Sequence, residues 1–146
     1  MNFTTAFARY RAKLTNANWA VSAIAADGSI VVSCWSHYFK PAKNGVLSYV
    51  DSLSRWNGSN VSGNNLLRTH LEQAVAGNLD VRLVLARTSD EAAVDRGEDA
   101  SKLSNTFGIR DDLVGTVTQF DGDNFVIEFR KAAQKSAAGD TGNPRA

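Results

Sequence analysis

With 146 residues, of which 43% are apolar and 21% charged, the chain has the composition of one globular domain, which excludes a disordered or fibrous body. Its 16 basic and 15 acidic residues give a net charge of +1, which excludes the overall positive field of a protein that coats DNA. A single cysteine, Cys34, excludes an internal disulfide and a zinc site built on cysteines.

No apolar run reaches the roughly 20 residues that a membrane-spanning helix needs. The first residues, MNFTTAFARYRAKL, lack the continuous apolar segment of a secretory signal. We therefore expect a cytoplasmic protein without a membrane partner.

The N-terminal third of the sequence predicts a short helix followed by a β-hairpin. Apolar residues recur every three or four positions over residues 3–14, which indicates one buried face of a helix. Two β-rich runs within residues 19–36 flank Asp27-Gly28, and such a dipeptide favours a tight hairpin turn. We expect residues 38–45 to leave the sheet, because Pro41 and Gly45 interrupt them. The type of the apolar segment 46–53 stays open.

A loop and a helix are expected next. The polar residues 57–65 predict a loop, with Asn64 or Asn65 as the N-terminal cap of the helix. The helix ends at Gly77-Asn78, a usual stop. Its apolar stripe consists of Leu66, Leu67, His70, Leu71, Ala74 and Val75.

The second half predicts a central strand over residues 79–88, a helix over 89–103 that Gly97 interrupts, and a hairpin of 113–120 with 124–130. Single helices among antiparallel strands indicate the α+β class. We expect one domain over residues 1–131. It would have a mainly antiparallel curved sheet or open barrel, built from two hairpins and a central strand, with about three helices. Residues 132–146 lose all apolar pattern and are expected to form a disordered tail.

Aromatic and polar residues near the 57–65 loop form the best candidate for a ligand site. Trp56 stands between Arg55 and Asn57, at the edge of a stretch of Gly, Asn and Ser. A flat π surface beside amides and a guanidinium suits a planar polar ligand, such as an unpaired base. The alternative is that Trp56 anchors the loop. Trp19 and Trp35, on the predicted hairpin, are more typical of core packing.

A family resemblance supports the same region. The segments WNGSNVSGNNLLR and AGNLDVRLVLARTSD resemble the central part of EVE-type domains of the PUA-like group, which includes the YTH relatives. These domains carry a Trp-x-Gly, a short polar stretch, an Asn-Asn-Leu-Arg type of helix start and then a strand. The spacing here departs by a couple of residues, with an additional Leu67, and the resemblance covers about a quarter of the chain. The matching positions are Trp56, Gly58, Asn64, Asn65, Leu66 and Arg68.

The resemblance implies nucleic-acid binding, with a modified base flipped into an aromatic cage. It implies Trp35, Trp56 and Asn64 as residues of the cage. Arg55 and Arg68 would then contact phosphates.

No catalytic or metal-binding pattern stands out. His37, His70 and Cys34 match no known ligand spacing, and structural roles are expected for all three. We expect neither a metal nor a cofactor, and an enzyme is the less favoured class.

Two functions stay open. The first is a non-catalytic module that recognises nucleic acid or a modified base. The second is a small protein-binding accessory or inhibitor protein, for example in a bacterial or phage defence conflict. Clustering of the basic residues on one face would favour the first, and scatter would favour the second. These residues are Arg9, Arg11, Arg82, Arg87, Arg110, Arg130 and Lys131.

Overall fold

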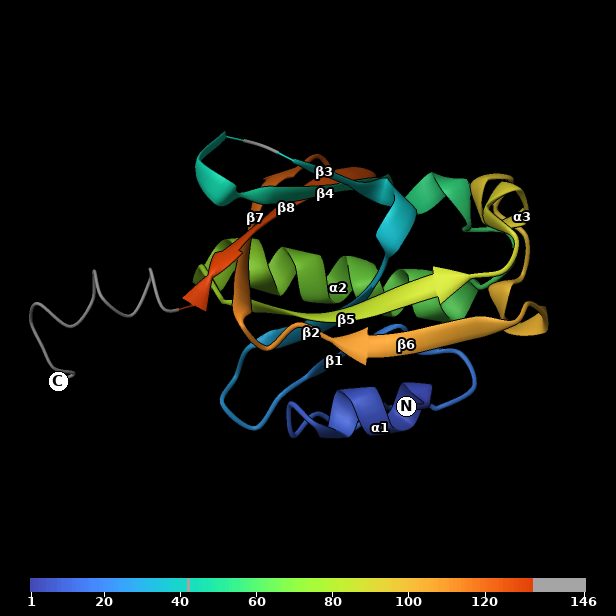
Figure 1. Cartoon of the computed structure of the whole chain (residues 1–146), viewed down its shortest axis with the longest axis horizontal. Coiled ribbons are helices and arrows are strands. Elements are labelled where there is room, and N and C mark those ends of the chain that lie inside the picture. Colours follow the sequence, from blue (N-terminus) through green and yellow to red (C-terminus); the bar gives the residue numbers. More distant parts are fainter. Residues whose placement is uncertain (42, 133–146) are drawn as a thin grey trace, which may run out of the picture.

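The computed structural model describes residues 1–41 and 43–132, and within them it has one mixed, mainly antiparallel sheet of eight strands with helices on both faces (Figure 1). The helices are α1 (Phe3–Ala8), α2 (Val61–Gly77) and α3 (Glu91–Asp95), and short 3₁₀ turns are η1 (Ser36–Tyr38), η2 (Lys43–Gly45), η3 (Leu53–Arg55) and η4 (Ala100–Lys102). The strands are β1 (Ser22–Ile24), β2 (Ile30–Trp35), β3 (Phe39–Pro41), β4 (Leu47–Ser52), β5 (Val81–Thr88), β6 (Asn105–Ile109), β7 (Leu113–Phe120) and β8 (Asn124–Lys131).

The strand order is β1-β2-β5-β7-β8-β4-β3, and β6 pairs separately with β5. The end strands β1 and β3 do not pair with each other, so the sheet is open. The fold is therefore the expected single α+β domain with a mainly antiparallel sheet.

One parallel pair determines where the C-terminal ends of two strands meet. β2 and β5 pair in parallel from Ile30–Val81 to Trp35–Ala86. Parallel neighbours need a long crossover connection, and the 17-residue helix α2 lies in the connection here. Because the two strands run in the same direction, Trp35 and the end of β5 reach the same edge of the sheet.

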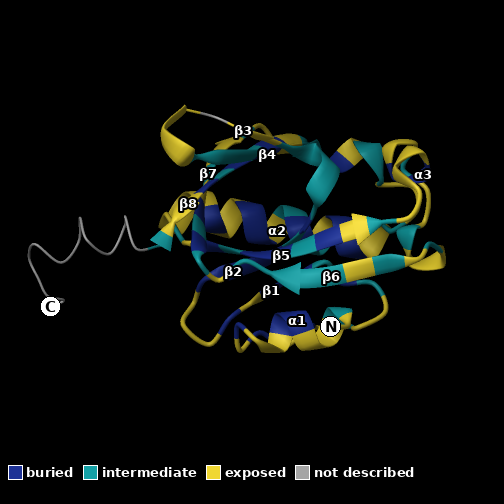
Figure 2. Cartoon of the chain, viewed as in Figure 1, coloured by how far each residue is buried: buried dark blue, intermediate teal, exposed yellow. Residues whose placement is uncertain are grey.

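Both faces of the sheet are covered, as the buried bands in Figure 2 show. On one face, Leu67 and Leu71 of α2 pack with Val32 of β2 and with residues of β8. On the other face, Phe7 of α1 packs with Val31 of β2. Neighbouring residues of β2 thus enter different cores, because successive side chains of a strand point to opposite faces.

Several predicted elements are confirmed. The hairpin around Asp27-Gly28 exists as β1 and β2, and Gly28 has the positive φ of 89° that the turn needs. The second hairpin exists as β7 and β8, and the predicted central strand is β5, with neighbours on both sides.

The predicted loop 57–65 is wrong in its second half, because α2 already begins at Val61. Asn60, rather than Asn64 or Asn65, caps the helix: its side-chain oxygen accepts from Gly63 N–H at 2.9 Å. Asn60 is followed by Val, Ser and Gly, which show no helical spacing of apolar residues. The sequence pattern therefore gives no sign of the first turn of α2.

Three strands were not predicted. The segment 46–53, whose type the sequence does not decide, contains β4, and the expectation that residues 38–45 leave the sheet is wrong for Phe39–Pro41, which form β3. β3 pairs with β4 although it contains Pro41, which an edge strand tolerates because one side of its backbone is unpaired. β6 pairs with β5, although its five residues include only two large apolar side chains, Phe107 and Ile109, which is too short a pattern to indicate a strand.

Two predicted helices are shorter than expected. α1 ends at Ala8, and Arg11 then takes a left-handed φ of 58°. α3 ends at Asp95, two residues before Gly97, whose φ is 76°. Residues 133–146, which make up the predicted tail apart from Ala132, lie outside the described residues. Among the described residues, no helix has the length and apolar character to cross a membrane.

Candidate functional site

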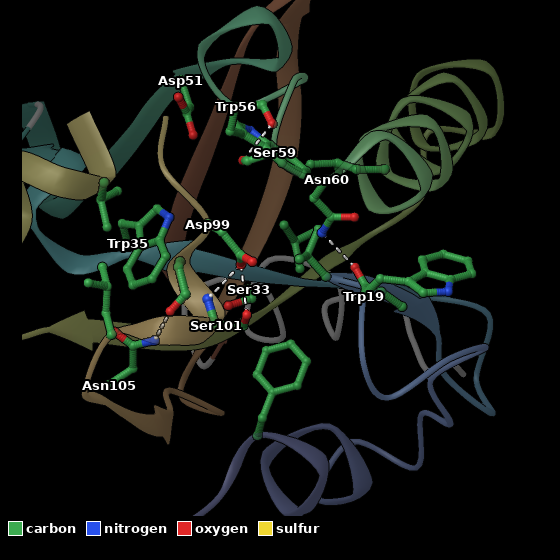
Figure 3. Close-up of a pocket in the computed structure, with 18 of the residues that line it drawn as sticks. Trp19, Ser33, Trp35, Asp51, Trp56, Ser59, Asn60, Asp99, Ser101 and Asn105 are labelled. Atoms are coloured by element: carbon green, nitrogen blue, oxygen red, sulfur yellow. Dashed lines mark hydrogen bonds between the residues drawn. The ribbon is translucent and has the colours of Figure 1, made fainter. Parts of the chain in front are cut away.

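A cavity of about 550 Å³ opens at the edge of the sheet where β2 ends, beneath the connection that follows β5. Connections diverge at the C-terminal ends of parallel strands, which makes this edge a common place for ligands. The segments that line it are residues 17–21, β2, the β4–η3 region, residues 59–60 before α2, residues 94–103 and β6. Figure 3 shows Trp35 and Asn105 on one side, Asn60 and Trp19 on the other, and Trp56 above.

A hydrogen-bonded chain from η3 to β2 holds one wall of the cavity. Arg55 donates from Nε and Nη2 to the two carboxylate oxygens of Asp51, at 2.8 and 2.9 Å. The Tyr49 hydroxyl donates to Asp51 at 3.3 Å and accepts from the Trp35 backbone N–H at 3.2 Å. Burial, and then the Asp51 charge, raises the pKa of Tyr49 well above its usual value, so the hydroxyl keeps its proton. This chain fixes the backbone of Trp35 relative to β4.

Arg55 has further partners within the protein. Its Nη1 donates to the Val94 carbonyl at 2.6 Å, and its guanidinium lies 5.0 Å from the centre of the Tyr38 ring. Asp51 also accepts from the Ser52 N–H at 2.8 Å. The two side chains are 15% and 6% exposed, so Arg55 and Asp51 form a largely buried, mutually neutralised pair.

Three polar groups at the cavity have no partner among the described residues. Asn105 donates from Nδ2 to the Ala100 carbonyl at 2.9 Å, but its Oδ1 is buried and accepts no hydrogen bond. The Trp35 indole N–H and the Ser33 hydroxyl also have no hydrogen-bond partner within residues 1–41 and 43–132. A buried polar atom without a partner is unfavourable, but Asn105 Oδ1 has almost no surface open to solvent, so a ligand in the cavity would not reach it in this conformation.

The opposite corner is held by Asn60. Its Nδ2 donates to the Trp19 carbonyl at 2.8 Å, while its Oδ1 caps α2. A side chain at Gly63 would collide with the Trp19 carbonyl, so only glycine allows this approach. Figure 3 shows that the Trp19 carbonyl faces Asn60 and that the Trp19 indole points away from the cavity.

Three of the five predicted site residues line the cavity, namely Trp35, Arg55 and Trp56. Trp35 and Trp56 are both partly buried and pack against the core on the α2 side. The predicted phosphate contact of Arg55 does not match its surroundings, because its guanidinium is already bound to Asp51 and Val94.

The other two predicted residues lie outside the cavity lining. Asn64 is fully buried, and its Nδ2 donates to the Leu53 carbonyl at 2.7 Å, which ties α2 to η3. Arg68 donates to Asn65 at 2.9 Å and lies 3.5 Å from the Gly122 carbonyl. In this fold both positions join α2 to its neighbours.

The histidines and the cysteine do not come together. His70 is 5% exposed and its Nδ1 lies 2.7 Å from Ser22 Oγ, inside the protein. His37 bonds to Asp95 at 3.0 Å, and burial raises the pKa of Cys34 well above its usual value. Within the part of the chain that the structure describes, no group of three or more His, Cys, Asp or Glu could hold a metal ion.

Basic residues do not form one continuous free surface. Arg110 and Lys131 both pair with Asp112, at 2.9 and 3.1 Å. Arg130 lies 3.8 Å from Glu128. Arg9, Arg11 and Arg82 line a second, smaller hollow of about 340 Å³ together with Asp27 and Asp111.

Sequence reasoning missed several polar residues of the cavity, among them Ser33, Asp51, Asn60, Asp99 and Asn105. Asp51 could have been found, because it stands four residues before Arg55. Asn60 was hidden within the expected loop. Ser33 has the same strand parity as Trp35, and Asn105 lies on the unpredicted strand β6.

A scan against protein-family models found no match, and searches of curated proteins and of solved structures also found no similar protein.

Proposed function

We propose that the protein is a non-catalytic binding module whose cavity takes up a flat, nitrogen-containing ring of the nucleobase class, as in an unpaired or modified base. The observation that carries this proposal is a cavity of about 550 Å³ that both Trp35 and Trp56 line, together with Ser33. Aromatic side chains hold bases by stacking, and amide groups recognise the edges of bases.

The size and lining of the cavity support a small ligand. A volume of about 550 Å³ is within the usual range of roughly 300–1,000 Å³ for small-molecule sites. The ring face would lie on an indole, and the ring edge would meet the Ser33 hydroxyl, which can both donate and accept a hydrogen bond. Neither His37 nor His70 lines the cavity, so its described lining lacks histidine, the residue that most often acts as a general base.

Selectivity for a base would come from the cavity rather than from a phosphate-binding groove. Arg55 is engaged with Asp51, and several exposed basic side chains pair with carboxylates. We therefore propose that affinity depends on ring contacts more than on salt-sensitive phosphate contacts.

The test is a titration with short single- and double-stranded DNA and RNA and with free nucleosides, at two salt concentrations. Tryptophan fluorescence detects binding, and calorimetry measures the affinity. We expect quenching by a base-containing ligand, and a loss of affinity of about tenfold or more in Trp35→Ala, since stacking contributes about 1–3 kcal/mol per base.

Trp19→Phe is the matched control, because the Trp19 indole points away from the cavity and the change keeps an aromatic ring. Ser33→Ala separates binding from folding: it removes a hydroxyl that has no partner among the described residues, so it should weaken binding while the free energy of unfolding changes by less than about 1.5 kcal/mol, the value of one net hydrogen bond. The proposal fails if no nucleic acid or nucleoside binds, or if Trp19→Phe weakens binding as much as Trp35→Ala. Either result would favour the alternative function, which is binding to a protein partner.

The scatter of the basic residues favours the protein-partner alternative, but the exposed apolar residues of the described surface do not. The large apolar side chains that are exposed lie on separate elements, namely β1, β4 and α2 and the first residue of the chain. A docking surface usually gathers such residues in one patch.

A further inference from the structure

We infer that the cavity selects a ring that carries a positive charge, such as an N-methylated nucleobase, over a neutral ring of the same size. This inference rests on the proposed function, because it specifies the charge of the ring that the cavity takes up.

Asp99 supplies a negative charge that no basic side chain neutralises through a hydrogen bond or ion pair among the described residues. Its Oδ1 accepts from the Ser101 N–H at 3.0 Å and from the Ser101 hydroxyl at 2.7 Å, and both donors are neutral. These hydrogen bonds lower the pKa of Asp99, so it is ionised at neutral pH. Figure 3 shows Asp99 between Trp35 and Trp19, reaching toward Ser33 in this view.

The whole connection that borders the cavity is acidic. Residues 90–102 contain five acidic and two basic residues, which gives a formal charge of −3. Glu98 also lines the cavity, and its partner Arg96 is exposed, with the ion pair at 2.6 Å. This ion pair largely neutralises Glu98, and Arg55 neutralises Asp51, so the negative charge that remains on the cavity lining is that of Asp99.

The positively charged groups at the cavity already have hydrogen-bond partners within the protein. Arg55 is the basic residue of the described lining, and Asp51 neutralises it through two hydrogen bonds. The N-terminus of α2 is capped, because Gly63 N–H donates to Asn60 Oδ1 at 2.9 Å. An anionic ligand would therefore be repelled by the Asp99 carboxylate, whereas a cation would be attracted to it.

The aromatic wall favours the same charge. A cation is attracted to the face of an indole in addition to the stacking that a neutral ring gains. Trp35 offers such a face, and Trp56 lines the same cavity.

The polar groups of the cavity favour a ring over a methylated alkylammonium group. The Ser33 hydroxyl has no partner among the described residues and can accept from the exocyclic amino group of a methylated cytosine or adenine, whereas a trimethylammonium group has no N–H to donate. A trimethyl-lysine peptide is thus the disfavoured source of positive charge.

A pair of isomers tests the inference. 3-Methylcytidine is a cation at neutral pH, whereas 5-methylcytidine has the same atoms and is neutral. Calorimetric titration of the full chain should show at least about tenfold tighter binding of 3-methylcytidine. The ratio should fall as salt is added, because screening weakens charge attraction.

Asp99→Asn should reduce the ratio to about threefold or less, because asparagine keeps an oxygen acceptor for Ser101 but loses the charge. Glu91→Gln is the matched control: it removes one charge from the same acidic connection, and Glu91 does not line the cavity. This variant should keep the preference.

The outcomes separate the two proposals. Equal binding of the isomers, or tighter binding of 5-methylcytidine, would overturn the inference and leave the proposed function standing. Failure of every nucleoside and oligonucleotide to bind would overturn both. Tight binding of trimethyl-lysine with no binding of nucleosides would replace the ring with an alkylammonium ligand.

Discussion

At the scale of single residues, the Asp51–Arg55 pair is the contact on which the cavity wall depends. The pair is largely buried, and each partner has further bonds to Tyr49, Ser52 or Val94. Removing one partner leaves an unpaired charge in a poorly solvated place. We expect Arg55→Ala to lower the free energy of unfolding by about 3–5 kcal/mol, as for other broken buried pairs.

Urea denaturation monitored by circular dichroism measures this change. Arg96→Ala is the comparison, because the Arg96–Glu98 pair is 59% and 51% exposed and should cost less than about 1 kcal/mol. If the two substitutions lowered the free energy of unfolding equally, the buried Asp51–Arg55 pair would contribute no more to stability than an exposed ion pair.

At the scale of elements, two short connections must approach each other for the cavity to form. Gly97, after α3, has a φ of 76°, and a side chain there would collide with the Arg55 carbonyl of η3. We expect Gly97→Ala to cost about 1–3 kcal/mol through backbone strain and to weaken ligand binding by displacing residues 98–103.

Gly58→Ala provides the control for this prediction. Gly58 has no atom within 4 Å of the added carbon and no positive φ, so its replacement should change stability by less than about 0.5 kcal/mol. Chemical denaturation and calorimetry on both variants would measure the two effects. A Gly97→Ala protein with unchanged stability and affinity would refute this role of the α3–η3 contact.

At the scale of the whole molecule, stability should depend on pH through His70. Burial lowers its pKa below the ordinary 6.5. The unfolded chain therefore takes up a proton as the pH falls through about 6.5, while folded His70 resists protonation. The contribution of His70 to the free energy of unfolding should be greatest above that pH. It should decrease as the pH falls below about 6.5, until the pH reaches the pKa of His70 in the folded protein.

Denaturation at about pH 7.5 and pH 5.5 tests this behaviour, and both values lie well above the ordinary carboxyl pKa range. His70→Gln should reduce the difference between the two conditions. If the difference is the same in this variant, another group is responsible.

The sequence predicted elements where the pattern is local. The β1–β2 hairpin follows from Asp27-Gly28, and β5 from a continuous apolar run. The edge strand β3 and the strand β6 were missed, because their pairing depends on residues distant in the chain rather than on periodicity.

The same limit explains how much of the candidate site was predicted. Trp56 and Arg55 were identified from their polar surroundings, which are adjacent in sequence. Asp99 and Asn105 reach the cavity only because the connection after β5 folds back over the end of β2. The resemblance to EVE-type domains stays a prediction.

The measurement that tests the central claim most directly is an NMR titration of the three indole N–H signals with the nucleoside that binds tightest. The chain has three tryptophans, and single Trp→Phe variants assign the signals. We predict that the Trp35 and Trp56 signals shift with ligand concentration and that the Trp19 signal stays in place, because its indole points away from the cavity. Saturable binding that leaves the Trp35 and Trp56 signals unchanged would contradict the account.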